Sequence, residues 1–179
     1  MTADMVRQIA PLVPALRRYA RALLRDRSAA DDLVQDCLER AIGRWYQRRE
    51  DGNARSWVFT ILHNLAMTRL RRASERPPHL ALDDTDETSL SFAAPQEDRM
   101  RYRDLLAALH QLPDEQRTVL LLVTVEELSY ADAAKVLDIP IGTVMSRLSR
   151  ARERLLGLMS AEPQPRAAGK AHPNLRSVK

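Results

Sequence analysis

Apolar residues recur at intervals of three and four along most of the chain, which is the spacing of one face of a helix. The first stripe lies in residues 5–24. Its regular helix is expected to begin between Pro11 and Pro14, because proline fits only the entry or the first turn. Ser28 and Ser56 are expected to be the N-caps of the next two helices. These helices and the two that follow are predicted over residues 28–42, 57–73, 100–112 and 113–123.

The stretch from Ser129 to Arg152 contains two short helices separated by a tight break. Asp138 to Pro140 interrupts the apolar pattern, because proline cannot donate an amide proton and disfavours helix at the preceding residue. Small and basic side chains remain on the outer face of the second helix, which is typical of a helix-turn-helix that enters a major groove. The spacing also fits a plain helical hairpin with a solvated basic face. The expected buried positions are Ala133, Ala134, Leu137, Val144, Leu148, Ala151 and Leu155, and the expected outer face is Met145, Ser146, Ser149 and Arg150.

The first half of the chain carries polar faces of different character. Arg17, Arg18, Arg21 and Arg25 form the polar side of the first helix and are expected to be solvated. The next helix has a carboxylate-rich outer side, but no histidine or second carboxylate helix accompanies it, so a metal site is not expected. The third helix ends in a basic cluster. The outward positions of these two helices are Asp32, Gln35, Asp36, Glu39 and Arg40 on the second, and His63, Asn64, Met67, Thr68, Arg71 and Arg72 on the third.

Residues 74–98 show no sustained period and combine three prolines with a nearly unbalanced run of acidic residues. This composition is typical of a linker. The sequence therefore predicts an all-α chain of two small helical domains joined by a flexible acidic linker, the second domain with the helix-turn-helix. The predicted divisions are residues 1–74, 75–98 and 99–160, followed by a disordered tail over 161–179.

Charge and composition narrow the function classes. A net charge of +4 and a pI near 9.6 fit a partner that carries phosphates. Cys37 is the only cysteine, which excludes a disulfide within one chain. No apolar run approaches the length that crosses a bilayer, and no signal-peptide core is present, so a cytoplasmic protein is expected. His63, His110 and His172 have no nucleophile–base or metal spacing, so neither catalysis nor a cofactor is expected.

With both halves laid out, the chain resembles the extracytoplasmic-function (ECF) sigma factors of bacterial RNA polymerase. The resemblance covers about residues 12–73 and 98–159. Each motif alone is weak, but all of them occur in order across the acidic linker. The matching residues are LRRYA at 16–20, DLVQ at 32–35, WVFTI at 57–61, Asn64, LPDEQR at 112–117, Ser129, Tyr130, Ala133, Ala134 and GTVMSRLSRAR at 142–152.

The resemblance implies a sigma factor that binds core RNA polymerase and directs promoter-specific transcription initiation. Its first domain would hold the clamp helices of the largest polymerase subunit and read the minus-ten element. The loop of residues 46–56 would capture a flipped base. The polymerase-binding residues would be Asp32, Gln35, Asp36, Glu39 and Arg40, and the minus-ten residues Arg55, Asn64, Arg71 and Arg72. Trp57 is expected to serve the core instead, since aromatic side chains strongly favour burial.

The resemblance also implies that the second domain rests on the polymerase flap and places its last helix on the minus-thirty-five element. Asp138 stands where many members have glycine, and aspartate tolerates a positive φ there. Members are usually held inactive by an anti-sigma factor, which is therefore an expected partner. The minus-thirty-five residues would be Met145, Ser146, Ser149 and Arg150 for bases, with Thr143, Arg147 and Arg152 for phosphates.

Two alternatives remain. One is a helix-turn-helix regulator that binds DNA without polymerase and uses its first domain for ligand or dimer contacts. The patch that begins at Asp32 and the acidic linker argue against it. The other is an enzyme acting on nucleic acid, which the arrangement of the histidines does not support.

Overall fold

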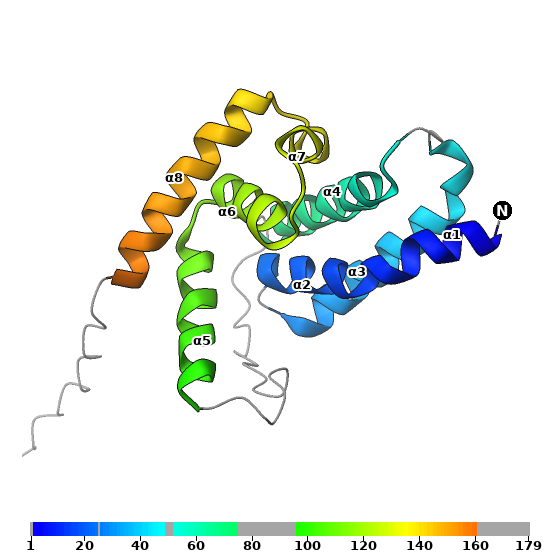
Figure 1. Cartoon of the computed structure of the whole chain (residues 1–179). Coiled ribbons are helices and arrows are strands. Elements are labelled where there is room, and N and C mark those ends of the chain that lie inside the picture. Colours follow the sequence, from blue (N-terminus) through cyan, green and yellow to red (C-terminus); the bar gives the residue numbers. More distant parts are fainter. Residues whose placement is uncertain (1, 25, 49–51, 75–95, 161–179) are drawn as a thin grey trace, which may run out of the picture.

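The computed structural model describes residues 2–24, 26–48, 52–74 and 96–160 (Figure 1). Every regular element in these ranges is a helix, which confirms the predicted all-α class. The first half consists of α1 (Thr2–Ile9), a 3₁₀ turn η1 (Ala10–Leu12), α2 (Val13–Leu23), α3 (Arg27–Gly43), a 3₁₀ turn η2 (Trp45–Gln47) and α4 (Ala54–Ser74). The second half consists of α5 (Gln96–Gln111), α6 (Asp114–Leu120), a π-helical turn η4 (Leu121–Val125), α7 (Tyr130–Leu137) and α8 (Ile141–Ser160).

The two prolines near the N-terminus sit where the sequence places them. Pro11 lies in the 3₁₀ turn and Pro14 in the first turn of α2, which begins at Val13 between them. The short helix α1 in front of them was not predicted, because Met5, Val6 and Ile9 give it only a brief apolar stripe.

Both predicted N-caps of the first half are wrong by a few residues. Asp26 caps α3 by accepting a hydrogen bond of 2.9 Å from the amide of Ala29, so the helix begins before Ser28. The helix α4 begins at Ala54 and not after Ser56, whose hydroxyl donates to the carbonyl of Asn53 within the first turn. In each case the chain has two capping side chains close together, and the earlier one is used.

The start of α5 at Gln96 corrects the predicted end of the linker, since residues 96–98 are helical. The acidic side chains of Glu97 and Asp98 lie in the first turn of this helix, where carboxylates interact favourably with the helix dipole. The remainder of the predicted linker, residues 75–95, and the predicted tail, residues 161–179, lie outside the described residues. The division into domains therefore stays a prediction.

Each half has a tightly packed interior. In the first half α2, α3 and α4 pack on one another around Leu16, Leu33 and Leu62, which are fully buried. In the second half α8 packs on α5, α6 and α7, with Val119 and Val144 fully buried. The predicted apolar stripes are thus the buried sides of these helices.

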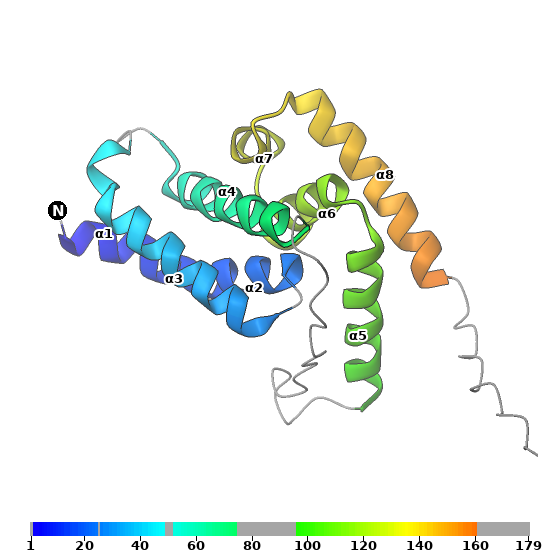
Figure 2. The same cartoon turned by 180° about the vertical axis from the view of Figure 1, so that it is seen from behind.

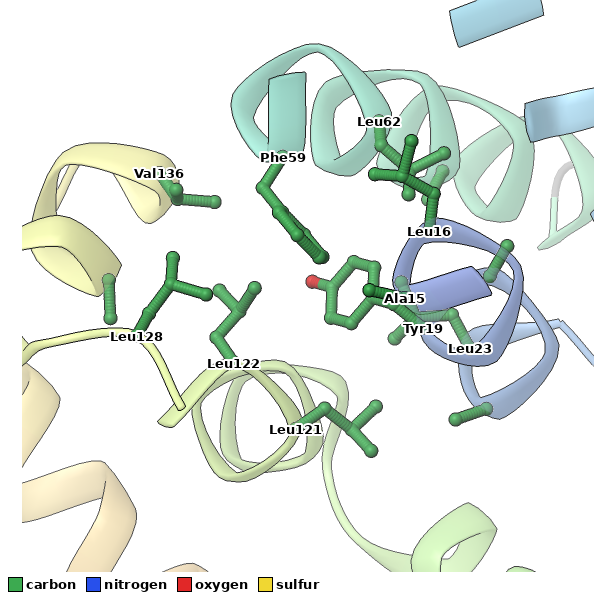
Figure 3. Packing of buried hydrophobic residues seen from close by; sticks show 14 of the residues in the cluster. Ala15, Leu16, Tyr19, Leu23, Phe59, Leu62, Leu121, Leu122, Leu128 and Val136 are labelled. Atoms are coloured by element: carbon green, nitrogen blue, oxygen red, sulfur yellow. The ribbon is translucent and has the colours of Figure 1, made fainter. Parts of the chain in front are cut away.

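The interiors of the two halves are also continuous with each other. Helix α7 packs on α4, and α5 and the π turn pack on α2, as seen from both sides in Figures 1 and 2. Figure 3 shows Tyr19 and Phe59 pointing into the same space as Leu121, Leu122 and Val136. The rings of Tyr19 and Phe59 meet edge to face with their centroids 5.6 Å apart. The two halves are therefore closed on one another.

Candidate functional site

The helix-turn-helix forms by local chemistry that the sequence predicts well. Ser129 caps α7: its hydroxyl accepts a 3.0 Å hydrogen bond from the amide of Asp132 and donates to the carboxylate of the same residue at 2.8 Å. Asp138 ends α7 in the left-handed conformation, with φ of 52°, as expected for its place in the turn. The amide of Ile139 then bonds to the carbonyl of Ala134, which closes the turn before Pro140.

Helix α8 has one buried side and one open side. Val144, Leu148 and Ala151 are buried, as predicted, and Leu155 packs partly against the same core. Met145 is 53% exposed. The other members of the predicted outer face, Ser146, Ser149 and Arg150, are exposed beside it. This face of α8 is therefore open to a partner.

The three residues expected on phosphates have different surroundings. Arg152 is exposed, and Thr143 is half-buried in the first turn of α8. Arg147 is turned toward α6: its guanidinium lies 2.7 Å from the carboxylate of Glu115, and the side chain is 25% exposed. Arg147 therefore already has an internal anionic partner.

The four residues expected at the minus-ten element do not share one face of α4. Asn64, Arg71 and Arg72 are exposed along the second half of the helix. Arg55 precedes Asn64 by nine positions, about two and a half turns, and so faces the opposite side. Its guanidinium lies over the ring of Phe59, 5.6 Å from the centroid, and donates to the carbonyl of Glu126 at 2.7 Å.

Aromatic side chains gather where the η2 turn meets the start of α4. Trp45 and Trp57 stand edge to face with their centroids 5.9 Å apart, and Arg48 lies 4.6 Å from the centroid of Trp45. Trp57 packs against the core, as expected. Tyr46 is 72% exposed. Residues 49–51 of the predicted base-capture loop lie outside the described residues, so its role stays a prediction.

The acidic side of α3 borders a shallow groove of about 380 Å³. Leu38 and Ile42 supply apolar surface at this groove, and Ile42 is 51% exposed. Gln35 donates to Glu39 at 3.1 Å across one helical turn. The groove is lined by Arg17, Asp31, Asp32, Val34, Gln35, Leu38, Glu39 and Ile42. Three of the residues expected to bind polymerase, Asp32, Gln35 and Glu39, therefore lie along this groove.

The other two members of the expected polymerase set differ from these. Arg40 is exposed outside the groove. Asp36 accepts a 2.8 Å hydrogen bond from Arg69 of α4, and Arg69 also donates to the carbonyl of Ala29. Asp36 therefore joins α3 to α4 in addition to facing outward.

His63 was predicted to point outward and is instead buried. Its Nδ1 atom shares a hydrogen bond of 3.1 Å with the hydroxyl of Tyr19. Burial lowers the pKa of His63 to about 4 and raises the pKa of Tyr19 above its ordinary value, so both groups are neutral. Burial likewise raises the pKa of the Cys37 thiol to about 12, which makes it unreactive.

The arginine side predicted to be solvated on the first helix has ion pairs at its three described members. Arg21 and Arg17 lie 3.1 and 3.8 Å from the carboxylate of Asp31, and Arg18 forms a two-pronged ion pair with Glu126 at 2.8 and 2.9 Å. Arg25 lies outside the described residues. Arg18 and Glu126 are 108 positions apart, so no local signal in the sequence could have joined them.

The described residues contain no group of three or more histidine, cysteine, aspartate or glutamate side chains that could hold a metal ion. None of the helices in the described ranges has the length and apolar character needed to cross a membrane.

Comparison with known proteins supports the resemblance in both halves. Residues 9–63 match the family described as the Sigma2 domain of PhyR, and residues 102–155 match Sigma-70, region 4. The chain is 34% identical over 162 residues to the ECF RNA polymerase sigma factor EcfG of Rhodopseudomonas palustris (strain TIE-1), covering 89% of this chain and 87% of that protein. It is 36% identical over 150 residues to the ECF RNA polymerase sigma factor SigC of Mycobacterium tuberculosis (strain CDC 1551 / Oshkosh), covering 79% and 75%.

A solved structure agrees with these matches. The sigma factor RpoE from Bartonella quintana, crystallised with the anti-sigma factor NepR, superposes with a TM-score of 0.73 at 32% identity, covering 89% of this chain and 98% of that one. These relatives favour the sigma-factor interpretation over a regulator that acts without polymerase. The chain belongs to the ECF RNA polymerase sigma factors.

Proposed function

We propose that this chain binds core RNA polymerase and directs it to promoters by contacting two DNA elements. The observation that carries the proposal is the open face of α8, which lies opposite the buried side of the helix and is formed by Met145, Ser146, Ser149 and Arg150. A helix held rigidly from behind, with small and basic side chains in front, fits the major groove. In a sigma factor this groove would belong to the minus-thirty-five element.

The acidic side of α3 is proposed as the surface for the clamp helices of the largest polymerase subunit. A carboxylate-rich face in a protein of net charge +4 suits a basic protein surface better than DNA. The groove between Asp32 and Glu39 offers apolar contact from Leu38 and Ile42 in its interior. Protein interfaces commonly have an apolar centre surrounded by a polar and charged rim.

The exposed half of α4 is proposed for the minus-ten element. Asn64 can hydrogen-bond to base edges, and Arg71 and Arg72 can contact the backbone. Arg55 lies on the other side of the helix, so in the closed structure it cannot act with them. The second domain is further proposed to rest on the polymerase flap.

An anti-sigma factor is a proposed partner as well. The relative from Bartonella quintana was crystallised with one, and the present chain covers 98% of that sigma factor. We assign no catalysis and no cofactor to this chain, since the chemistry of transcription would be that of the polymerase. Its place of action would be the cytoplasm, where the polymerase works.

A pull-down with purified core polymerase tests the proposal directly, followed by run-off transcription over a library of genomic promoter fragments. The expected result is a stable holoenzyme that initiates at a small set of related sequences. If the chain binds specific duplex DNA but forms no complex with the polymerase, the proposal is wrong and the regulator interpretation replaces it.

A further inference from the structure

Glu126 is a buried carboxylate whose charged partners come from the other half of the molecule. It follows the π turn of the second half, and its side chain has no exposed surface. Arg18 of α2 approaches it with Nε at 2.9 Å and Nη2 at 2.8 Å. Arg55 of α4 reaches the same carboxylate at 3.4 Å and the backbone carbonyl of Glu126 at 2.7 Å. Two guanidinium groups therefore hold one residue from two sides.

This cluster depends on the closed arrangement of the two halves. A buried carboxylate is costly unless cations and hydrogen bonds compensate it, and removal of one partner leaves an unpaired buried charge. Both ion pairs that the structure gives Glu126 come from helices of the first half. Hydrogen bonding to Glu126 also raises the pKa of Arg18 above its ordinary value. Separation of the halves would break all of these contacts together.

The two arginines would remain on packed neighbouring helices after such a separation. They lie on α2 and α4, which pack on one another through Tyr19, Phe59 and His63. The side chains of Arg18 and Arg55 are already 52% and 37% exposed. The Nε atom of Arg55 has no protein acceptor among the described residues. The first half thus carries two guanidinium groups on neighbouring helices, and Glu126 uses only part of their hydrogen-bonding capacity.

The proposed function requires that separation. Elements centred near minus ten and minus thirty-five lie about 25 base pairs apart, or ~85 Å at the rise of B-DNA. In the structure α7 packs on both α4 and α8, so the start of α8 lies roughly two interhelical spacings, ~20 Å, from α4. The closed arrangement therefore cannot reach both elements at once.

We propose that Arg18 and Arg55 form an anion site on the first half, which Glu126 occupies in the closed protein and a backbone phosphate of single-stranded DNA occupies when the halves separate. A carboxylate and a phosphate satisfy the same two-pronged guanidinium geometry. Glu126 and DNA consequently compete for the two arginines. The identity of the DNA as promoter rests on the proposed function, but the competition itself does not need polymerase.

The test compares two adjacent glutamates in the full-length chain. Glu126→Gln and Glu127→Gln make the same change in net charge. Glu126 is buried in the cluster and hydrogen-bonded to Arg18, whereas Glu127 is exposed and acts on Arg18 only weakly, through its charge. Binding to a fluorescein-labelled, mixed-sequence single strand of about 12 nucleotides is measured by anisotropy. Glu126→Gln should tighten binding at least fivefold, because the arginines are freed. Glu127→Gln should stay within about twofold of the parent chain.

Two further measurements separate a DNA site from a merely structural contact. Small-angle scattering should show a larger radius of gyration for Glu126→Gln. In the Glu126→Gln background, Arg18→Met and Arg55→Met should each abolish most of the gain in DNA affinity. Each should also reduce the magnitude of the slope of log K against log salt by about 0.7, the value for one phosphate contact on a single strand. Glu126→Asp, which keeps the charge on a shorter arm, should give an intermediate affinity if Glu126→Gln folds poorly.

The proposal is overturned if Glu126→Gln or Glu126→Asp leaves DNA affinity unchanged, or if the gain persists without Arg18 and Arg55. None of these measurements contains polymerase. If the chain does not bind polymerase but the variants change DNA binding as expected, only the proposed function is refuted. If the chain binds polymerase but the variants do not change DNA binding, only the anion site is refuted.

Discussion

Tyr19 and His63 are the polar residues at the centre of the first half. His63 lies on α4 one position beyond Leu62, in a helix covered by α2 and α3 and also by α7. A helix buried on more than one side has no clear outer face, so the apolar spacing misplaced this residue. The hydrogen bond to Tyr19 compensates the burial of both polar groups.

Acid should weaken the fold through His63. Its pKa in the folded protein, about 4, lies below the ordinary value of 6.5, so the unfolded chain binds the proton more readily. The stabilisation is complete above pH 6.5 and is lost as the pH falls toward 4. The expected loss in the free energy of unfolding is about 2 kcal/mol at pH 5.

Urea unfolding of the parent chain and of His63→Gln, between pH 7.5 and 4.5, measures this contribution. The glutamine cannot titrate, so its stability should fall less steeply with acid. Parallel curves for the two proteins would show that other groups cause the whole pH dependence.

At the scale of elements, the sequence predicts a helix end or turn well where one local signal is present, and poorly where two capping residues lie close together. The helix-turn-helix was correct to its turn because Ser129, Asp138 and Pro140 leave few other conformations. The starts of α3 and α4 were wrong because a second capping residue precedes each predicted serine. The side chains of Asp26 and Asn53 accept the hydrogen bonds from the first-turn amides. The spacing of apolar residues alone predicted the open face of α8. It did not predict the ion pair between Arg147 and Glu115.

Arg147 and Arg150 on α8 should respond differently to substitution. Arg150→Ala should weaken binding of duplex promoter DNA by about 1–3 kcal/mol and relax specificity at one base pair, if the side chain contacts a base in two-pronged fashion. Arg147→Ala removes the half-buried pair with Glu115 and should instead lower the melting temperature. Polymerase-dependent footprinting and thermal melts of both variants distinguish the two roles. Equal losses of DNA affinity without a change in melting would contradict the assignment.

Asp32 and Asp36 offer a similar comparison one turn apart on α3. Asp32→Ala should weaken the complex with core polymerase at least tenfold while the fold remains intact, because this side chain is exposed at the groove. Asp36→Ala breaks the pair with Arg69 and should cost about 0.5–1 kcal/mol of folding stability. Binding titrations and urea unfolding measure the two effects. Gln35→Ala should resemble Asp32→Ala, and an undiminished polymerase affinity in both would exclude this face.

At the scale of the whole molecule, the closed arrangement is the feature that the sequence did not predict. The linker composition indicated two small domains and left their relative placement open, and in the structure Tyr19 and Phe59 share a buried cluster with Leu122 and Val136. These contacts join residues far apart in the chain, and periodicity reports only which side of a helix is apolar. A stripe that packs within a domain and a stripe that packs between domains look alike in sequence.

The shared interior predicts that the two halves unfold together. Trp45 and Trp57, the only tryptophans, both lie in the first half, so their fluorescence reports that half, while far-ultraviolet circular dichroism reports all helices. In the parent chain the two urea transitions should coincide, because the halves are coupled through Glu126 and the apolar contacts around it. In Glu126→Gln the fluorescence and dichroism midpoints should separate, whereas Glu127→Gln should keep them together. Separate midpoints already in the parent chain would mean that the halves fold independently and that the closed contact is too weak to hold them.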